Sequence, residues 1–403
     1  MRRSSRALER ALAEVEQQQL RRRRLTLEPL DSIAGVRIRG SDQRLTNFSS
    51  NDYLGLAREP RLADRMAQCA HAQGAGSGAA HLVSGHGSEH AALEEEIAQF
   101  VGRERALLFS TGYMANLAAL TTFVGRGDRV LLDRLDHASL IDGALLSGAI
   151  FARYTHADAD ALARRLGTPG ETPGTSALVA TDGVFSMDGD IAPLGAIARL
   201  CRDHEAWLVV DDAHGIGVVG ANGRGSLEHA GLSSDDVPIL VGTFGKAFGS
   251  FGAFVAGDGP VVELVLQRAR SYIYTTALPQ PVAAATRAAL EIARQEPWRR
   301  ERVLALTARL RSGLAREGLE LTASQTPIQP IILGSAGRAL AAQSRLQDAG
   351  FLVTAIRPPT VPAGSARLRI ALSAAHRESD VDALVTALAD VLSGLPDTAR
   401  PLA

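Results

Sequence analysis

The amino-acid sequence predicts an α/β protein built on a mostly parallel sheet, followed by a smaller α+β region. Two observations carry this prediction. Between residues 47 and 278, short apolar runs bounded by Gly, Asp and Pro alternate with helical stretches such as residues 194–204. Unbroken apolar runs are typical of strands buried on both faces, and helices between them favour parallel neighbours. After Pro279 the chain turns mostly helical, with shorter strands.

The elements of each region can be placed from the same pattern. The expected large sheet has strands at residues 106–109, 129–133, 176–181, 207–212, 239–243 and 252–256. The later region should hold helices at residues 282–295, 301–317 and 378–392 and strands at residues 328–333, 351–355 and 366–372. We therefore expect an N-terminal helix and arm (residues 1–46), a large α/β domain (47–285) and a small α+β domain (286–403).

The N-terminal segment should be an amphipathic helix over residues 4–24, because Leu8, Leu12, Val15 and Leu20 recur at helical spacing. Its last turn would carry four consecutive arginines, residues 21–24. These are either a solvated helix end whose charges favour the helix dipole or a clamp for an acidic ligand. The sequence leaves both interpretations open.

Composition argues against several classes of function. With 43 Lys and Arg against 44 Asp and Glu, the 403-residue chain has a net charge of −1 and no global attraction to nucleic acid or an anionic membrane. It shows neither a signal peptide nor an apolar stretch that could span a bilayer. Only Cys69 and Cys201 occur, which favours a reducing compartment over a disulfide framework. We expect a soluble, cytoplasmic protein.

The most informative stretch is residues 243–249, TFGKAFG. Lys246 stands among small and apolar residues just after a buried strand, where it is poorly solvated. A lysine in such surroundings has a lowered pKa and becomes a usable amine nucleophile. The flanking glycines let a bulky group approach the backbone. The alternative is a lysine whose stem is buried at a domain edge while its charge reaches water.

A polar cluster follows the strand expected at residues 207–212. Asp211 and Asp212 stand at its carboxyl end, where open α/β sheets bind ligands, and His214 follows. A carboxylate there can hold a pyridinium nitrogen protonated, and His214 can reach the same ring. The three residues could also bind a metal ion, but no second His, Cys or carboxylate cluster at suitable spacing supports that alternative.

Two other motifs match a function only in part. Residues 215–220 fit the G-x-G-x-x-G string of dinucleotide-binding proteins, but the residues that follow, ANGRG, predict a loop where the fingerprint needs a helix. Ser186, Asp211 and His214 could form a hydrolase triad. However, the chain has no G-x-S-x-G nucleophile elbow. The sequence disfavours both interpretations.

A phosphate site is expected where the strand at residues 106–109 ends. The small residues from Ser110 to Gly112 should open a helix whose first N–H groups point outward, the usual geometry for an anion at a helix N-terminus. Tyr113, in the same turn, is by itself more typical of a core residue. His137 follows the next strand and is by itself more typical of a structural histidine.

Together these stretches resemble the α-oxoamine synthases, a family of fold-type I enzymes that use pyridoxal phosphate (PLP). The resemblance runs from residues 47–56, NFSSNDYLGL, to residues 367–369, RLR, and residues 355–362, AIRPPTVP, are its most discriminating part. It implies an aspartate-aminotransferase-like fold with a seven-stranded large sheet. It also implies a homodimer whose active sites are shared between subunits.

The resemblance implies a role for each matching residue around the cofactor ring. Lys246 would carry the cofactor as a Schiff base, and Asp211 would pair with the pyridine nitrogen. His214 and Ser186 would contact the region of the ring hydroxyl. His137 would stack on the ring face.

The remaining implied contacts lie around the phosphate and the substrate. Gly112, Tyr113 and Thr243 would lie along the cofactor, and Thr275 and Thr276 would reach the phosphate of the neighbouring subunit. The positions associated with substrate are Arg21, His137, Arg357 and Thr360.

Two residues depart from the pattern of the family. Asp136 stands before His137 where a small or amide side chain is usual, so we expect it to make His137 more basic. Asp182 stands where Glu is usual before Gly-Val-Phe-Ser. Neither departure involves the Schiff-base lysine.

The implied reaction is the decarboxylative condensation of L-alanine with a pimeloyl thioester, carried by CoA or an acyl carrier protein, in biotin biosynthesis. The first alternative is a glycine-using sister enzyme, such as 2-amino-3-ketobutyrate ligase or 5-aminolevulinate synthase. The choice between alanine and glycine depends on about one methyl group in the amino-acid pocket, which is worth roughly 1–3 kcal/mol of discrimination. A PLP-binding regulatory or transport protein and a nicotinamide dehydrogenase are alternatives from other classes.

Overall fold

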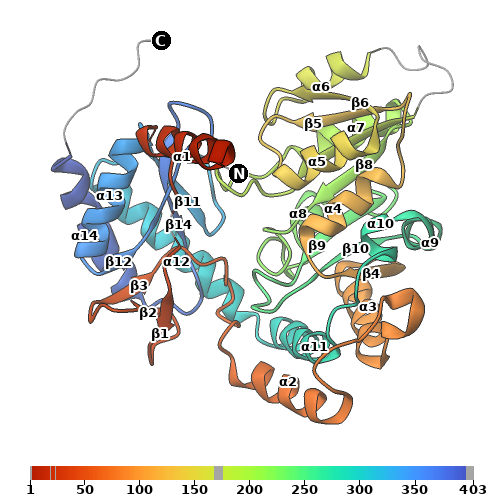
Figure 1. Cartoon of the computed structure of the whole chain (residues 1–403), viewed down its shortest axis with the longest axis horizontal. Helices are drawn as coiled ribbons and strands as arrows, with labels where there is room; N and C mark the ends of the chain where they lie inside the picture. The colour runs from red at the N-terminus through yellow and green to blue at the C-terminus, as the bar shows by residue number, and fades with distance from the viewer. Residues whose placement is uncertain (1, 19, 23, 168–175, 396–403) are drawn as a thin grey trace. The chain divides into compact units, whose positions relative to one another are not determined.

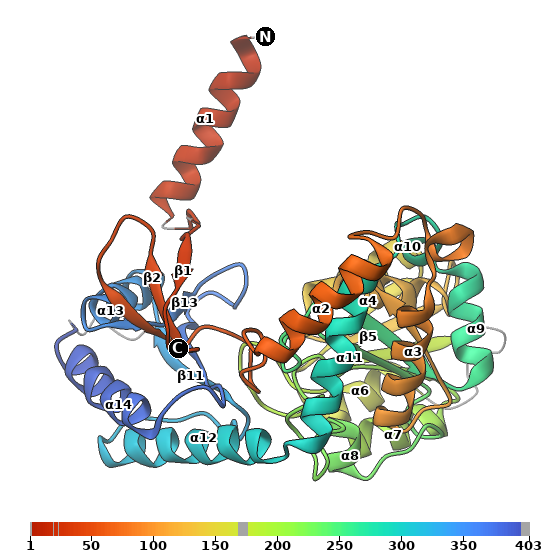
Figure 2. The same cartoon turned by 90° about the horizontal axis from the view of Figure 1, so that it is seen from below.

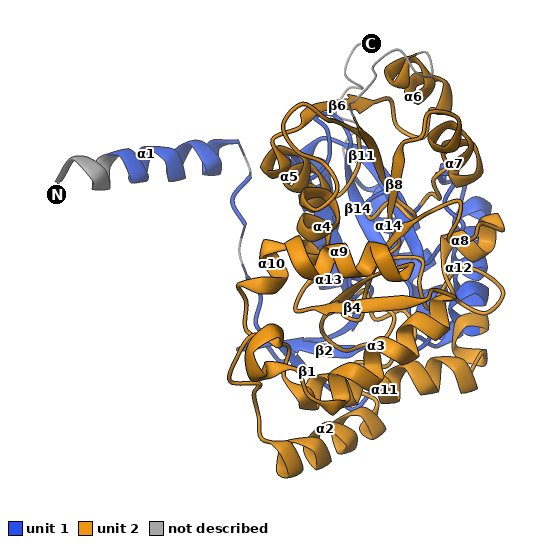
Figure 3. Ribbon diagram, turned by 90° about the vertical axis from the view of Figure 1, so that its right-hand side faces the viewer, with its two compact units in different colours: residues 1–50, 187–189, 302–403 blue, residues 51–186, 190–301 orange. Residues whose placement is uncertain are grey.

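The computed structural model describes residues 2–18, 20–22, 24–167 and 176–395. The chain divides into two compact units (Figure 3). Unit 1 comprises residues 1–50, 187–189 and 302–403, and unit 2 comprises residues 51–186 and 190–301. These bounds differ from the three segments expected from the sequence, and that division stays a prediction.

Unit 2 holds a seven-stranded sheet with the strand order β4-β10-β9-β8-β7-β5-β6. Its strands are β4 (Arg105–Phe109), β5 (Arg129–Asp133), β6 (Ile150–Tyr154), β7 (Ala177–Asp182), β8 (Trp207–Asp211), β9 (Ile239–Thr243) and β10 (Ala253–Gly257). Strands β5 to β9 pair in parallel, whereas β10 is antiparallel to both neighbours. The predicted mostly parallel sheet is confirmed. The strand β6 was not predicted, because this half-exposed edge strand contains Arg153 and lacks an unbroken apolar run.

Helices alternate with these strands, as the pattern predicted (Figure 1). They are α2 (Pro60–Gln73), the π-helical turn η1 (His81–Gly85), α3 (Ser88–Val101), α4 (Gly112–Thr121), α5 (Ala138–Ser147), α6 (Ala159–Leu166), α7 (Leu194–Asp203), α8 (Ser226–Ala230), α9 (Gly259–Arg268), α10 (Arg270–Ile273) and α11 (Gln280–Gln295). Helix α4 packs against α5 and against strands β9 and β10, and α11 runs beside α2 (Figure 2).

The core of unit 2 explains why the strand runs are apolar on both faces. Leu208 and Val210, whose side chains point to one face of the sheet, are fully buried. On the other face, Leu178, Val209 and Val241 from the neighbouring strands β7, β8 and β9 belong to one buried cluster. Ala115 and Ala119 of α4 belong to the same cluster. Because these helix residues are small, α4 can lie close to the sheet, and its first turn is thereby fixed near the ends of the strands.

Unit 1 joins both ends of the chain. One sheet has the order β1-β2-β3-β12 and the other β11-β14-β13. The elements are α1 (Arg2–Gln17), β1 (Leu27–Pro29), β2 (Gly35–Ile38), β3 (Arg44–Asn47), β11 (Ile328–Gly334), α13 (Ala336–Asp348), β12 (Phe351–Leu352), β13 (Thr354–Ile356), β14 (Ala366–Ala371) and α14 (Glu378–Ser393). Helix α12 (Trp298–Arg316) begins in unit 2 and ends in unit 1.

The expectation that the N-terminal helix reaches residue 24 is wrong. Helix α1 ends at Gln17, so Arg21, Arg22 and Arg24 follow the helix and do not form its last turn. Consecutive arginines would place like charges three residues apart on one helix face, which disfavours continuing the helix. Of the helices in the described ranges, none has both the length and the apolar character that crossing a membrane requires.

A partly buried ion cluster in unit 2 joins the ends of β5 and β6 to the loop after β7. The Nδ1 atom of His156, just after β6, lies 2.9 Å from Asp133 Oδ1, and Nε2 lies 2.9 Å from Asp190 Oδ2. Burial lowers the pKa of His156, but the hydrogen bonds with the two carboxylates outweigh it and raise this pKa to about 10. The imidazolium therefore links the loop after β5 to the loop after β7.

We expect His156→Asn to lower the free energy of unfolding at pH 7 by about 1–3 kcal/mol, because Asp133 stays buried without its cation. The histidine contribution should be complete below about pH 6.5 and should be lost as the pH rises through about 10, since the folded-state pKa is raised. Urea unfolding at several pH values measures the free energy of unfolding and its dependence on pH. His71→Asn, at an exposed histidine of α2, is the control, and an equal loss in both variants would contradict the prediction.

Candidate active site

The carboxyl ends of the parallel strands carry acidic side chains. Strands β5, β7 and β8 end at Asp133, Asp182 and Asp211, and the last two lie directly opposite one another in the register of β7 and β8. Strand β9 ends at Thr243, three residues before Lys246. This edge of an open α/β sheet is where such folds bind ligands.

A cavity of about 190 Å³ opens at this edge, within unit 2. It is lined by Gly112, Tyr113, Asn116, His137, Ser139, Asp182, Val184, Ser186, Asp211, Ala213, His214, Thr243 and Lys246. The structure thus brings together all but two of the residues expected to hold the cofactor. Those two, Thr275 and Thr276, lie between α10 and α11 and are absent from the described lining of this cavity.

Asp211 is held by two donors. The backbone N–H of Ala213 donates to Oδ1 at 3.0 Å, and Asn116 Nδ2 donates to Oδ2 at 2.5 Å. Asn116 also donates to the hydroxyl of Ser139 at 2.8 Å. Both partners keep the carboxylate fixed for a cation in the cavity. Asn116 was not predicted to belong to the site. Its signal in the sequence is that it lies one helical turn after Gly112 and therefore on the same helix face.

The two histidines of the cavity are each anchored by a hydroxyl group. His137 is the N-cap of α5, and its Nδ1 lies 2.6 Å from Ser139 Oγ. His214 Nδ1 lies 2.6 Å from the Tyr53 hydroxyl oxygen. Burial lowers the pKa of His137, against the opposing charge of Asp211, so a neutral ring is favoured there.

The expectation that Asp136 makes His137 more basic is wrong. The Asp136 carboxyl points to backbone groups and accepts from the N–H of Asp133 at 2.8 Å and of Asp182 at 2.9 Å. Burial and the neighbouring Asp182 raise the pKa of Asp136, which favours its neutral form. Asp136 therefore orders the turn before His137 without adding a charge beside the ring.

Asp182 is the other buried acid at this edge. Burial and the charge of Asp211 raise its pKa, and the backbone N–H of His137 donates to its carboxyl. Its Oδ1 atom has no hydrogen-bond partner among the described residues, and the same holds for Asn116 Oδ1. Two unsatisfied oxygens in the walls of one cavity are typical of a site that holds a polar ligand.

The predicted phosphate site has the expected backbone. Helix α4 begins at Gly112, and its N-cap Thr111 accepts a hydrogen bond from Met114 N at 3.2 Å. A Cβ atom on Gly112 would meet nothing within 4 Å, so the space before the helix is open. Tyr113 is 42% exposed and hydrogen-bonds Asp142, so it is not a core residue.

The nucleotide-binding alternative weighed from the sequence finds no support at this edge. Residues 215–220 lead through turns to the five-residue helix α8, so the nucleotide fingerprint lacks its helix. Asp212 is buried, accepts from Ser226 N at 2.7 Å, and its pKa is raised by burial to about 7. It is therefore a structural acid away from the cavity lining.

A cluster of His81, His86 and His90 was not foreseen, and their ring nitrogens lie within 4.8 Å of one another. His90 uses both nitrogens in hydrogen bonds, since Nδ1 accepts from Gly87 N at 3.0 Å and Nε2 lies 2.5 Å from the carbonyl oxygen of Leu278. It therefore has no lone pair to offer a metal ion in this arrangement. The cluster packs η1 against α3.

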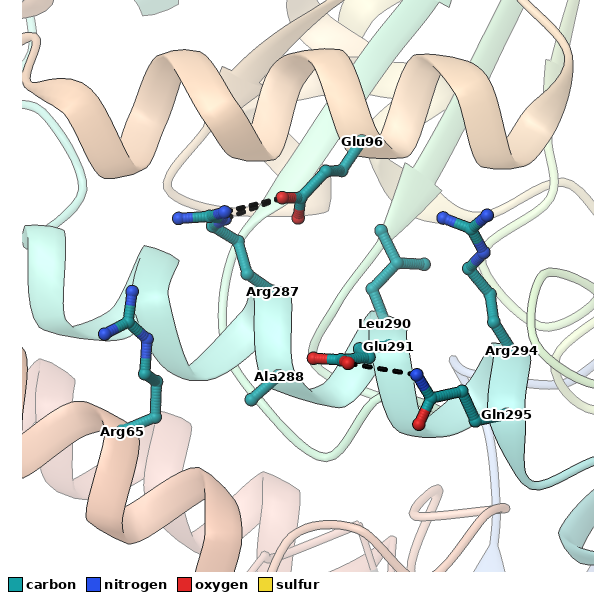
Figure 4. Close-up of a pocket in the computed structure, with 8 residues that line it drawn as sticks. All are labelled: Arg65, Glu96, Arg287, Ala288, Leu290, Glu291, Arg294 and Gln295. Carbon is teal, nitrogen blue, oxygen red and sulfur yellow. Dashed lines mark hydrogen bonds and ion pairs between the residues drawn. The ribbon is translucent and has the colours of Figure 1, made fainter.

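A larger cavity of about 630 Å³ lies along α11, with Arg65 and Arg294 at its sides (Figure 4). Its charges are largely paired. Arg287 contacts Glu96 at 2.6 Å and Glu89 at 2.7 Å, and Arg65 contacts Glu89 at 3.0 Å. These ion pairs join α2, α3 and α11, which is a packing role.

Of the residues expected to bind substrate, His137 lines the cavity of unit 2, whereas the other three lie in unit 1. Arg21, Arg357 and Thr360 line a cavity of about 880 Å³ with apolar side chains such as Leu20. Arg357 donates to the carbonyl oxygen of Arg21 at 3.5 Å, and Arg22 Nη2 lies 3.5 Å from Thr360 Oγ1. The three residues are therefore neighbours.

Comparison with known proteins identifies the class of the fold and site. Residues 43–388 match the family model of class I and II aminotransferases. A serine palmitoyltransferase variant from S. paucimobilis, with a PLP–myriocin aldimine bound, superposes with a TM-score of 0.87. It is 31% identical, and the match covers 91% of this chain and 92% of that one.

Closer relatives narrow the assignment. An 8-amino-7-oxononanoate synthase of Alkalilimnicola ehrlichii is 56% identical over 96% of this chain and 98% of its own. The synthase of Methylococcus capsulatus is 55% identical over 95% of this chain and 97% of its own. The chain therefore belongs to the class I and II aminotransferase family of PLP enzymes and, within it, to the 8-amino-7-oxononanoate synthases of biotin biosynthesis.

The cavity fits PLP. It offers an amine, a fixed carboxylate, two imidazoles and the start of a capped helix, and its unsatisfied oxygens mark a polar occupant. Lys246 is also the only lysine in the sequence, and the other 42 of the 43 Lys and Arg residues are arginines. An arginine cannot replace it, because the guanidinium stays protonated and does not form imines.

We expect Asn116→Ala to lower the free energy of unfolding by about 1–3 kcal/mol, because the buried Asp211 loses a charge-assisted donor. PLP affinity should fall as well, since the carboxylate can turn. Denaturant unfolding and a PLP titration measure the two effects. Thr121→Ala is the control, because that hydroxyl bonds only to its own helix. Unchanged stability in Asn116→Ala would contradict the role given to this bond.

Proposed function

We propose that the chain condenses L-alanine with a pimeloyl thioester to form 8-amino-7-oxononanoate, carbon dioxide and the free thiol. The observation that carries this proposal is that the sole lysine of the sequence and the fixed Asp211 line the same cavity. A relative named 8-amino-7-oxononanoate synthase is 56% identical to this chain. PLP supplies the electron sink for bond-breaking at the α-carbon. The protein has to bind, orient and move protons.

Each residue of the cavity has a proposed task. The amine of Lys246 binds the cofactor and afterwards moves the α-proton. Asp211, fixed by Asn116, keeps the pyridine nitrogen protonated. His137, whose neutral form burial favours, covers the ring face. His214 and Ser186 contact the ring oxygen, and Gly112, Tyr113 and Thr243 lie along the cofactor.

The substrate contacts and the assembly are also proposals. Arg21, Arg357 and Thr360 share a cavity that combines arginines with apolar walls, which suits an acyl chain with an acidic end. A homodimer would bring Thr275 and Thr276 of one subunit to the phosphate of the other. We also propose a cytoplasmic location, which the two separate free cysteines favour.

A glycine-using synthase is the second candidate, because one methyl group separates the two amino acids and is worth only about 1–3 kcal/mol. Adding L-alanine or glycine to the PLP-loaded protein together with pimeloyl-CoA decides between them. Free thiol and product with alanine support the proposal. Free thiol with glycine alone, together with the corresponding amino ketone that lacks the methyl group of alanine, would leave the family assignment intact and refute the alanine assignment.

We expect Lys246→Ala and Lys246→Arg to lose turnover by several orders of magnitude, because no other lysine can form an imine with the cofactor. Lys246→Arg keeps the positive charge and so separates amine chemistry from electrostatics. Borohydride reduction of the PLP-loaded protein, followed by peptide mapping, should mark Lys246 alone. Normal turnover in either variant would refute the role of this residue.

A further inference from the structure

A tyrosine that the sequence analysis gave no role lies behind the cofactor cavity. Tyr53 is 1% exposed, and its hydroxyl oxygen lies 2.6 Å from Nδ1 of His214, which lines the cavity. The same hydroxyl group donates to Oδ1 of Asn51 at 3.2 Å. All three residues belong to unit 2.

The hydroxyl group decides which nitrogen of His214 carries the proton. A neutral imidazole has one N–H and one bare nitrogen, and the partner of one nitrogen fixes the state of the other. The phenol has a single proton, which it donates to Asn51 Oδ1 in the present orientation of the amide and would donate to His214 if that amide were turned. The shorter contact is to His214, and a contact of 2.6 Å suits an O–H donor facing a bare nitrogen.

Asn51 is compatible with this assignment. Its side-chain amide presents an oxygen or an NH2 group to the same point after a half-turn. With the NH2 group toward Tyr53, Asn51 donates to the phenol oxygen while the phenol donates to His214. Both hydrogen bonds then run in one direction, toward the cavity.

We propose that Tyr53 is a positioning residue that holds His214 with its proton on Nε2, so that this N–H is the donor to the ring oxygen of the cofactor. The inference rests on the proposed function, because the acceptor is a PLP oxygen. Burial of both side chains strengthens the bond, since water competes little for either group. Without the hydroxyl, the proton can move to Nδ1, and the cofactor loses a donor.

The test compares Tyr53→Phe with Tyr154→Phe in the full-length, PLP-loaded protein. Tyr154 is a buried tyrosine of β6, outside the cavity lining. We expect Tyr53→Phe to weaken PLP binding about three- to tenfold and to shift the pH midpoint of the visible absorbance of bound cofactor by at least about half a unit. Tyr154→Phe should change neither property.

A double-mutant cycle separates a positioning role from a merely structural one. In a His214→Asn background, Tyr53→Phe should add no further change to PLP affinity or to the absorbance midpoint, because its effect passes through His214. Additive effects would overturn the proposal, as would a Tyr53→Phe variant that matches the parent protein. Because both readouts come from bound cofactor, they are measured only on the folded fraction of each variant.

The outcome also distinguishes this inference from the proposed function. If the parent protein itself takes up no PLP, the proposed function fails. If the parent takes up PLP and Tyr53→Phe behaves identically, only the role of Tyr53 fails.

Discussion

The register between β7 and β8 is the constraint on which the site depends. It places Asp182 directly opposite Asp211 at a buried sheet edge, with Asp136 bonded to the backbone of Asp182. Several carboxylates so close together cannot all be ionised at low dielectric. The structure resolves this by raising the pKa of Asp136 and Asp182 and by giving Asp211 two strong donors.

The neutral forms of Asp136 and Asp182 are therefore favoured, while Asp211 is distinguished from them by its two hydrogen-bond donors. Asp211 can then pair with a ring cation, while its neighbours order the backbone. Asp136 accepts from the backbone N–H groups of Asp133 and Asp182, and Asp182 accepts from the backbone N–H of His137. The acids thus act on the backbone around His137 through hydrogen bonds, and not through charge.

Hydroxyl groups hold the two histidines by hydrogen bonds, as amide groups hold the acids. Ser139 holds His137 and Tyr53 holds His214, each through Nδ1. The hydrogen bond made by one ring nitrogen influences which nitrogen carries the proton in the neutral ring. The anchors come from α5 and from the segment before α2, so the packing of these segments onto the sheet sets the chemistry of the site.

The sequence by itself determined the apolar strands of unit 2, though not β6 or the end of α1, and the residues whose chemistry is local. The mostly parallel sheet followed from unbroken apolar runs, and Lys246, Asp211 and His214 followed from their places after buried strands. The loop after Gly220 was also predictable, because Asn, Gly and Arg in succession do not form a helix there. These signals lie within a few residues of one another, so no tertiary contact was needed.

Only the tertiary structure decided how distant residues share a charge or a proton. Asn116 bonds Asp211 across 95 residues and Tyr53 bonds His214 across 161, and no local pattern marks either pair. Asp136 is adjacent to His137 in sequence, yet its carboxyl faces the backbone, so proximity along the chain gave the wrong expectation. Sequence spacing fixes which side chains share a face, but burial and hydrogen bonding across elements fix their protonation.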